Sequence, residues 1–390
     1  MAETRIRASG IVTPTRGAPR LTVSLDTLRL ERDATGRVTG SRRVAGSADQ
    51  DAGKETGLLL TEAAERTASA VAGLQSAVAQ IHEWRDGDGL PVSRRAELLA
   101  RVETPGGPVL LGTSGPGDPA GLVEALPWDE LGALSTPFAP ADPPGDWRER
   151  PLLLRPSAAS VLVAGAAFSL TSRGGRATAA RLAGRRILPQ LTLTDLPSAP
   201  PGSGLNGSGL DASALDASAL DGAALDGAAL GASGLDDRGD PALPTVLVDG
   251  GRICPPPPLA EGIARGRAVW DHDTGGFGPP PLARLELGGP LAEVPPDAVE
   301  LVWCVEGLQR YHGDGTVRLQ CLARVADRPG GWFRLALRGK PVHLLRQARG
   351  LAGPPMAVHS DSDVTTRSLV LAGAAEMEGA GHAVVTVITP

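Results

Sequence analysis

Side chains that commonly perform catalysis are scarce in this sequence and rarely stand at catalytic spacings. The chain has six histidines and three cysteines among 390 residues. No two histidines stand at the H-x-x-x-H spacing that would suit a helical zinc site, and three scattered cysteines are too few for a four-cysteine site. The nucleophile elbow G-x-S-x-G is absent, and the glycine-rich segment 112–117 lacks the lysine of a phosphate-binding loop. Local motifs of these types therefore assign no catalytic chemistry to the chain.

Two polar loops come nearest to a metal-binding pattern. In one loop His272 stands between two aspartates, and in the other His359 is followed by Asp361 and Asp363. Imidazole and carboxylate groups are common ligands of divalent metals. Polar loops of this kind are more often solvated surface than metal sites, so we expect both loops to be solvated.

One basic cluster stands out in the second third of the chain. Its members are Arg173, Arg176, Arg181, Arg185 and Arg186. The simplest interpretation is the solvated face of a helix. The alternative is a surface that contacts a partner protein or a peptide.

Composition and charge narrow the class of protein. The net charge of −6 and the pI of about 5.6 argue against a general nucleic-acid-binding protein. No apolar stretch reaches the roughly 18 residues that a membrane span requires, and the first residues lead into no apolar segment of a signal peptide. We therefore expect a cytoplasmic globular protein with neither a nucleic-acid nor a membrane partner.

Residues 1–145 are expected to form an N-terminal α/β domain with hairpin strands and a long helix. Apolar and polar residues alternate on either side of a turn that ends at Gly36, which predicts the hairpin. Leu74, Val78 and Ile81 recur at helical spacing, which predicts the helix. The expected elements are a hairpin over 20–46, a long helix over 58–82, a shorter helix over 93–102 and a strand over 109–111.

Residues 146–390 are expected to form a C-terminal, largely antiparallel β domain, which makes the whole chain an α+β protein. A buried strand is predicted over 152–154, followed by a helix that opens at Pro156 and runs to about Leu170. Further strands are predicted over 245–248, 299–306, 317–325, 332–337, 368–371 and 384–388, with a hairpin turn at 249–251.

A low-complexity tract over residues 202–237 interrupts this second domain. Leucine recurs there every five residues, and an aspartate or asparagine follows most of the leucines. Seven such repeats are too few for a pentapeptide β-helix, and five-residue steps scatter leucines around a helix axis. We interpret the tract as a linker-like insertion rich in glycine, alanine and serine.

The segment 151–163, with sequence PLLLRPSAASVLV, resembles the strand and helix that open the C-terminal domain of the TldD/PmbA (TldD/TldE) proteins. In TldD-type subunits that segment runs into H-E-x-x-x-H, the zinc-binding and catalytic helix. The two histidine positions are occupied here by Ala164 and Ser169, and the glutamate position by Gly165. These residues supply neither the zinc ligands nor the carboxylate that transfers protons.

The resemblance continues through segments 236–253 and 335–350 and covers about residues 150–390. Residues 1–150 match only in general style. The late cysteine of TldD-type subunits has no counterpart near residues 357–363.

The resemblance implies a non-catalytic, TldE-like subunit that pairs with a separate TldD-like zinc metalloprotease. Such pairs degrade unfolded peptides or remove leader segments during maturation of peptide natural products. No cofactor is then expected in this chain, and zinc is expected in the partner subunit. Two alternatives stay open: a self-standing peptide-binding or scaffold protein that keeps only the fold, and an enzyme whose chemistry has moved to His272 with its flanking aspartates or to His359.

Overall fold

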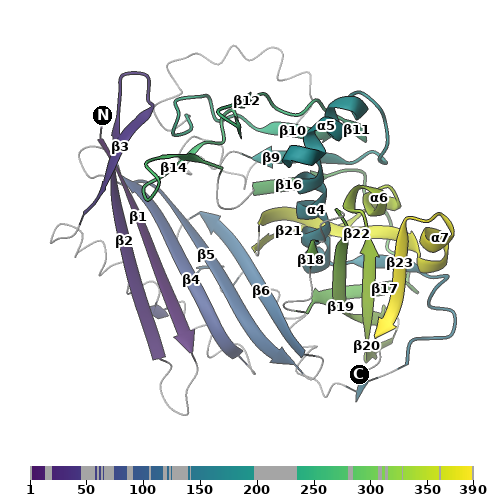
Figure 1. Cartoon of the computed structure of the whole chain (residues 1–390). Helices are drawn as coiled ribbons and strands as arrows, with labels where there is room; N and C mark the ends of the chain where they lie inside the picture. Colours follow the sequence, from purple (N-terminus) through teal and green to yellow (C-terminus); the bar gives the residue numbers. More distant parts are fainter. Residues whose placement is uncertain are drawn as a thin grey trace.

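The computed structural model places two β-sheets side by side, with a few helices against the second sheet (Figure 1). The residues it describes are 2–13, 20–44, 58, 61–62, 65, 74–85, 91–104, 107–116, 121–122, 124, 139–140, 142–196, 235–279, 284–305, 310–311, 315–326, 328–359 and 362–388. None of the helices in these ranges is long and apolar enough to cross a membrane.

The N-terminal sheet has six antiparallel strands in the order β3-β2-β1-β4-β5-β6. Their bounds are β1 (Ala2–Thr13), β2 (Arg20–Arg32), β3 (Val38–Arg43), β4 (Leu74–Arg85), β5 (Pro91–Thr104) and β6 (Gly107–Pro116). The predicted hairpin over 20–46 is confirmed as β2 and β3. Its turn is fixed by the Asp33 carboxylate, which accepts the backbone N–H of Thr35 and Arg37, and by Gly36 with a φ of 84°.

The helix predicted at 58–82 is confirmed at the described residues 58, 61, 62 and 65 but is wrong from residue 74 onward, and the helix predicted at 93–102 is wrong. Residues 74–85 form β4 and residues 91–104 form β5. In β4 the buried residues alternate, at Ala77, Ala79, Ile81 and Glu83, which is the period of a strand. The helical spacing of the larger apolar residues was misleading because alanines fill one face of this strand. Hydrogen bonding of β4 to β1 and β5 outweighs the intrinsic preference of these alanines for a helix.

The C-terminal sheet contains thirteen strands, mostly antiparallel, and the α+β class is confirmed. It is built from β7 (Ala139–Pro140), β8 (Pro151–Leu154), β9 (Thr192–Leu196), β10 (Thr245–Asp249), β11 (Arg252–Ile253), β16 (Arg284–Gly288), β17 (Val299–Cys304), β18 (Arg310–Tyr311), β19 (Val317–Val325), β20 (Arg328–Gly339), β21 (Ala348–His359), β22 (Asp363–Gly373) and β23 (Ala383–Ile388). Separate small hairpins are β12 (Leu259–Ala260) with β13 (Ile263–Ala264) and β14 (Val269–Asp271) with β15 (Gly276–Gly278).

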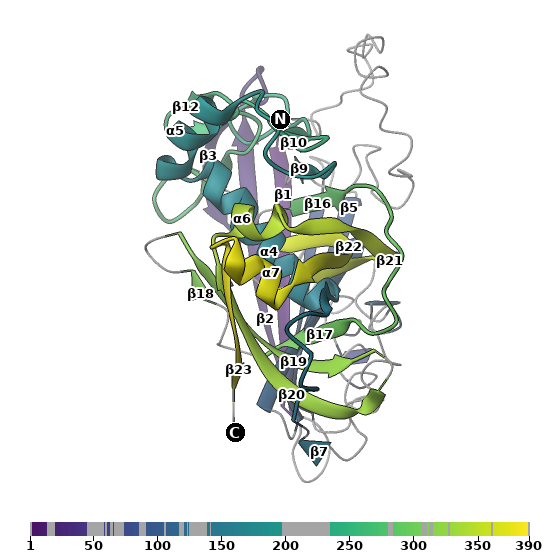
Figure 2. The ribbon, with the colours of Figure 1, turned by 90° about the vertical axis from the view of Figure 1, so that its right-hand side faces the viewer.

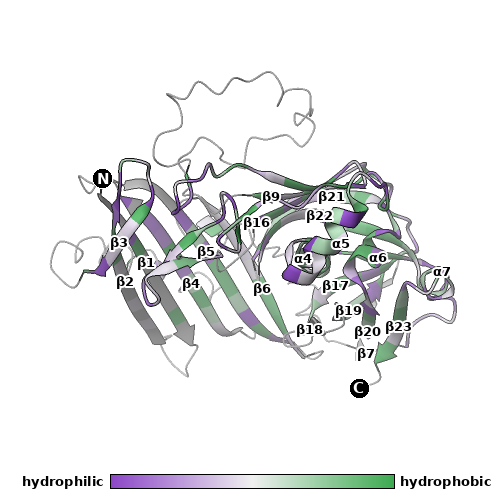
Figure 3. Ribbon diagram, turned by 45° about the horizontal axis from the view of Figure 1, so that its top comes forward, coloured by the Kyte–Doolittle hydropathy of each residue, from purple (hydrophilic) through white to green (hydrophobic). Residues whose placement is uncertain are grey.

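Four helices accompany this sheet, and the longest is central to its core. They are α4 (Pro156–Thr171), α5 (Arg173–Leu182), α6 (Pro341–Leu345) and α7 (Ala374–Gly379). The predicted helix opening at Pro156 is confirmed as α4, with proline in the first turn, where its missing N–H costs nothing. α4 is apolar on nearly all sides and packs against β17, β22, α5 and α6 (Figure 2). Hydrophobic residues also dominate β23 (Figure 3).

Most other strand predictions for the C-terminal part are confirmed. The turn predicted at 249–251 joins β10 to β11, and Gly250 and Gly251 have the positive φ angles of such a hairpin turn. The predicted strand 299–306 is β17 as far as Cys304. Of the five-residue repeat tract, only Leu235, Asp236 and Asp237 fall within the described residues, so its interpretation as a linker stays a prediction.

The two sheets approach most closely along β6. Gly112 of β6 packs directly on the backbone of His359, because a Cβ at position 112 would lie 1.9 Å from the His359 carbonyl oxygen. Val109 also forms an isolated antiparallel bridge with Val305, just beyond β17. Glycine is therefore required at position 112 for the N-terminal sheet to sit against β21.

A second connection lies at the other side of the N-terminal sheet, around Asp237. Its carboxylate accepts hydrogen bonds from Arg5 of β1 at 2.5 and 2.7 Å, from Arg32 of β2 at 2.8 Å and from the backbone N–H of Trp270 at 2.8 Å. We call Asp237, Arg5 and Arg32 the Asp237 cluster. Burial raises the pKa of Asp237, but the two guanidinium groups outweigh burial and hold it below its ordinary value.

Candidate functional site

The positions that match the zinc motif of TldD-type subunits lie on α4, as expected, but carry no metal-binding group. Ala164 is half-buried against the core and Gly165 is buried. The Ser169 hydroxyl donates to the Gly165 carbonyl oxygen at 2.7 Å, so it is tied to its own helix. This face of α4 has neither a zinc ligand nor a base that could activate water.

The arginine cluster predicted from the sequence lies on and just after α5. Arg173, Arg181, Arg185 and Arg186 are exposed, whereas Arg176 is half-buried and donates to the Pro257 carbonyl oxygen. The exposed members form a basic surface beside α4, and contact with a partner or a peptide stays a prediction for them.

The loop around His272 uses its polar groups to hold its own hairpin. The Asp271 carboxylate accepts the backbone N–H groups of Asp273 and Thr274, which lowers its pKa. His272 Nδ1 lies 2.8 Å from the Ser41 hydroxyl of β3, and Asp273 pairs with Arg43 at the surface. Asp271, His272 and Asp273 therefore stabilise the turn and its contact with β3.

The second predicted loop is different, because it is buried between the two sheets. Glu97 of β5, His359 at the end of β21 and Asp363 at the start of β22 are each less than 10% exposed. His359 Nδ1 lies 2.7 Å from Asp363 Oδ1, and His359 Nε2 lies 3.7 Å from Glu97 Oε2. One ligand atom from each of the three residues lies within 4.8 Å of the others. We call these three residues the Glu97 cluster. The expectation that His359 and Asp363 are solvated is wrong. Asp361, from the same predicted loop, lies outside the described residues.

Neighbours from three strands hold the two carboxylates of the Glu97 cluster. Arg95 of β5 donates to Asp363 Oδ2, and its Nε lies 3.5 Å from Glu97 Oε1. Ser114 of β6 donates to Asp363 Oδ1 at 3.0 Å. His82 Nε2, from β4, lies 3.5 Å from Glu97 Oε2. Five strands of two separate sheets, β4, β5, β6, β21 and β22, thus contribute polar groups to one buried region.

Both carboxyl groups are held in their ionised form. Burial raises the pKa of Glu97, but the hydrogen bond and charge of His82, together with His359, outweigh it and leave the pKa below its ordinary value. Burial acts on Asp363 in the same way, and the hydrogen bond from His359 with the charge of Arg95 again lowers the pKa overall. At neutral pH both groups therefore accept hydrogen bonds or coordinate cations.

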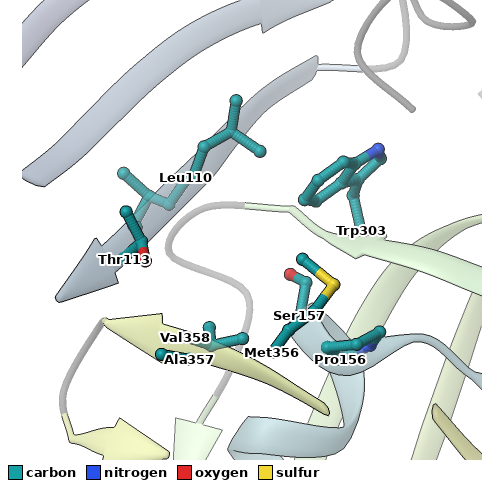
Figure 4. Close-up of a pocket in the computed structure, with 10 residues that line it drawn as sticks. Leu110, Thr113, Pro156, Ser157, Trp303, Met356, Ala357 and Val358 are labelled. Carbon is teal, nitrogen blue, oxygen red and sulfur yellow. The ribbon is translucent and has the colours of Figure 1, made fainter. Parts of the chain in front are cut away.

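A small cavity lies between β6, the start of α4, β17 and β21 (Figure 4). It has about 20 Å³ of free space, enough for a single water molecule and too little for a peptide side chain. Its walls come from β6, the start of α4, β17 and β21, and include Leu110, Thr113, Pro156, Ser157, Trp303, Met356, Ala357 and Val358. The cavity therefore provides no ready-made substrate pocket.

Sequence reasoning missed Glu97, Arg95 and His82. All three lie on segments that were predicted as helices, so their common strand face could not be recognised. In the strand register His82 pairs with Arg95, which places them on the same face as Glu97. The available signal was the Arg-x-Glu pair within β5, two residues apart, which puts opposite charges on one face of a strand.

Comparisons with known proteins agree at the level of fold. No family model and no curated protein matches the sequence. The solved structure of TldE from Thermococcus kodakarensis matches with a TM-score of 0.57 and 12% identity over 95% of each chain. A Bacteroides thetaiotaomicron protein named as a candidate modulator of DNA gyrase matches with a TM-score of 0.46 and 10% identity, over 99% of this chain and 94% of that chain.

The first of these matches carries the assignment, because it extends over nearly the whole of both chains. It includes the N-terminal residues, for which the sequence resemblance was only general. The chain therefore has the TldD/TldE-family fold.

Proposed function

We propose that this chain is the non-catalytic, TldE-like subunit of a heterodimeric TldD/TldE-type zinc metalloprotease. The observation that carries the proposal is the composition of α4. The helix is formed and largely buried, and the sequence resemblance assigns Ala164, Gly165 and Ser169 to the positions of the zinc ligands and the base. Likeness to TldE over 95% of both chains supports the same assignment.

The chemistry of hydrolysis explains why these substitutions matter. A hydrolytic zinc ion needs three protein ligands and an open position for water, with a carboxylate nearby to move protons. A methyl group, a hydrogen and a hydroxyl bonded to its own helix supply none of these. In the proposed complex the partner subunit carries the catalytic zinc.

In this complex the chain would have a structural role and would limit which peptides reach the partner's active site. Its surface would complete the wall of the chamber that receives unfolded or leader peptides, as in maturation of peptide natural products. The exposed arginines beside α4 fit a contact with an acidic partner surface or peptide. Mass action would then stabilise each subunit through the other.

Co-expression with a TldD-like protein that retains H-E-x-x-x-H tests the proposal. We expect the two chains to co-purify at equal stoichiometry in size-exclusion chromatography, and the partner's cleavage of a leader peptide to depend on this chain. If the chains elute separately and this chain leaves cleavage unchanged, the proposal is wrong and a self-standing binding or scaffold protein becomes the better interpretation.

A charge-reversal variant then tests the surface. The double variant Arg181→Glu and Arg185→Glu should weaken co-purification if the basic surface is the contact. The matched control is Arg346→Glu, at an exposed arginine that follows α6 and lies outside the cluster. Equal behaviour of the two variants would remove the basic surface from the proposed interface while leaving the subunit assignment in place.

A further inference from the structure

In the Glu97 cluster, the contact between His359 Nε2 and Glu97 Oε2 is not explained by a hydrogen bond between the two atoms. The Asp363 carboxylate accepts hydrogen bonds from Ser114 and Arg95, so in the 2.7 Å contact it is His359 Nδ1 that donates. In the neutral imidazole, Nε2 then presents a lone pair toward Glu97 Oε2, 3.7 Å away. Two acceptors facing each other at this distance form no hydrogen bond.

The distances around Glu97 Oε2 are close to those between ligands of one metal ion. Zinc bonds to nitrogen and oxygen are about 2.0–2.2 Å long, so two ligands of a tetrahedral zinc ion lie about 3.4 Å apart. Glu97 Oε2 lies 3.7 Å from His359 Nε2 and 3.5 Å from His82 Nε2. Carboxylate and imidazole groups are also the donor set that zinc accepts.

Asp363 has the geometry of a residue that orients a metal-binding histidine. Histidines that bind metals usually donate their other ring nitrogen to a carboxylate, which fixes the tautomer and the orientation of the ring. Asp363 accepts that hydrogen bond from His359, and it is itself fixed by Ser114 and Arg95. The imidazole is therefore held with Nε2 toward Glu97.

We propose that Glu97 and His359, with Asp363 orienting the imidazole, bind a divalent transition-metal ion such as Zn²⁺ between the N-terminal sheet and the C-terminal sheet. His82 would join them as a third ligand only by exchanging its hydrogen bond to Glu97 for the metal ion. Because Glu97, His359 and Asp363 are all buried, the site is closed to substrate, and the metal would stabilise the contact between the sheets. The inference adds a structural metal to this chain and leaves the proposed function unchanged.

Two arginines set the selectivity of the site. Arg95 contacts Glu97 Oε1 and Asp363 Oδ2, which leaves Glu97 Oε2 facing the imidazoles. Arg284 is the register partner of Asp363 in the β16–β22 pair. Both guanidinium groups oppose a bound cation, so affinity must come from imidazole coordination. We therefore expect Zn²⁺ and Co²⁺ to bind and Mg²⁺ and Ca²⁺, which prefer oxygen ligands, to be rejected.

The test is metal titration of the purified full-length chain after treatment with a chelator and dialysis. Calorimetry with ZnCl₂ should give one Zn²⁺ per chain, CoCl₂ should give the visible absorption bands of low-symmetry Co²⁺, and MgCl₂ should give no binding. Glu97→Gln and His359→Gln should each lower the zinc affinity by about 100-fold or more, and Asp363→Asn by about 10- to 100-fold. The matched control is His272→Gln in the β14–β15 loop, which should bind zinc as the native chain does.

Circular dichroism of each variant separates loss of the site from loss of the fold. Glu97→Gln keeps the size and shape of the side chain, so it decides the question if His359→Gln does not fold. A chain without saturable zinc binding at one ion per chain would overturn the proposal. Zinc binding that survives Glu97→Gln, or that His272→Gln abolishes, would overturn it as well.

Discussion

The N-terminal sheet is fastened to the rest of the chain by two buried ionic clusters of different construction. In the Asp237 cluster one carboxylate meets two arginines and a backbone N–H, at distances of 2.5 to 2.8 Å. In the Glu97 cluster two carboxylates share one close arginine, and two imidazole nitrogens lie 3.5 and 3.7 Å from Glu97. Guanidinium groups keep their charge throughout the accessible pH range, whereas imidazole gains or loses it near neutrality.

This difference separates a permanent connection from an adjustable one. The Asp237 cluster joins one carboxylate to two arginines by direct hydrogen bonds, and the pKa of Asp237 lies below its ordinary value, so the strength of the cluster should vary little between pH 5 and 8. The Glu97 cluster, in our proposal, depends on a bound metal ion. The same sheet is thus held on one side by fixed charges and on the other by groups that respond to their surroundings.

Asp237→Ala should have the largest effect. Its removal leaves Arg32 buried, and Arg5 partly buried, without the carboxylate that compensates them, which costs about 3–5 kcal/mol in the free energy of unfolding. Urea denaturation followed by circular dichroism measures the loss. Glu376→Ala is the control, because the exposed Glu376–Arg349 pair should contribute less than about 1 kcal/mol. Equal losses for the two variants would show that the Asp237 cluster does not anchor the sheet.

Gly112→Ala should come next and should act on the side of the Glu97 cluster. The added Cβ would overlap the His359 carbonyl oxygen, and the resulting backbone shift should cost about 1–3 kcal/mol. Limited proteolysis should also cut the variant faster if β6 moves away from β21. Gly145→Ala is the control, since a Cβ there meets no atom within 4 Å. An unchanged unfolding midpoint in Gly112→Ala would contradict the close packing of the two sheets.

Acid should weaken the Glu97 cluster in a defined pH range. The pKa values of Glu97 and Asp363 lie below their ordinary values of 4.5 and 3.8. Their stabilising contribution is therefore complete above those ordinary values and is lost as the pH falls through the lower pKa values of the folded state. The free energy of unfolding, measured by denaturation between pH 7 and pH 3, should fall less steeply in Glu97→Gln than in the native chain. Parallel curves for the two proteins would refute the assignment of ionised Glu97.

Asp273→Ala should have the smallest effect. Asp273 and its partner Arg43 are both largely exposed, so water screens the pair, and the free energy of unfolding should change by about 0.5 kcal/mol or less. The same urea denaturation measures it. A loss above about 1 kcal/mol would mean that the β14–β15 hairpin is a third connection between the N-terminal sheet and the rest of the chain.

The parts predictable from the sequence were those with strong local signals. α4 is recognisable because a proline begins an unbroken apolar segment, and the β10–β11 hairpin because Asp249, Gly250 and Gly251 form the turn. β4 and β5 were not recognisable, since alanines such as Ala77 and Ala96 are good helix formers that become strand residues through pairing with neighbours.

The candidate site was only half visible for a related reason. His359 and Asp363 lie four residues apart and could be noticed together, although their burial could not. Glu97 comes from a different sheet, and its proximity to His359 depends on how β5 and β6 pack against β21. No local pattern encodes a contact of that kind.

The position of β8 has a consequence for the order in which the protein folds during synthesis. Leu152–Leu154 of β8 pair on one side with Val299–Leu301 of β17 and on the other with Leu369–Leu371 of β22. The ribosome therefore releases β8 and α4 long before their neighbours exist. The N-terminal sheet, whose strands pair mostly with sequence neighbours, can form early, whereas the C-terminal sheet must wait for nearly the whole chain. During that interval the apolar surface of α4 lacks the strands that later cover it. We expect a chaperone or another chain to protect it from aggregation at this stage.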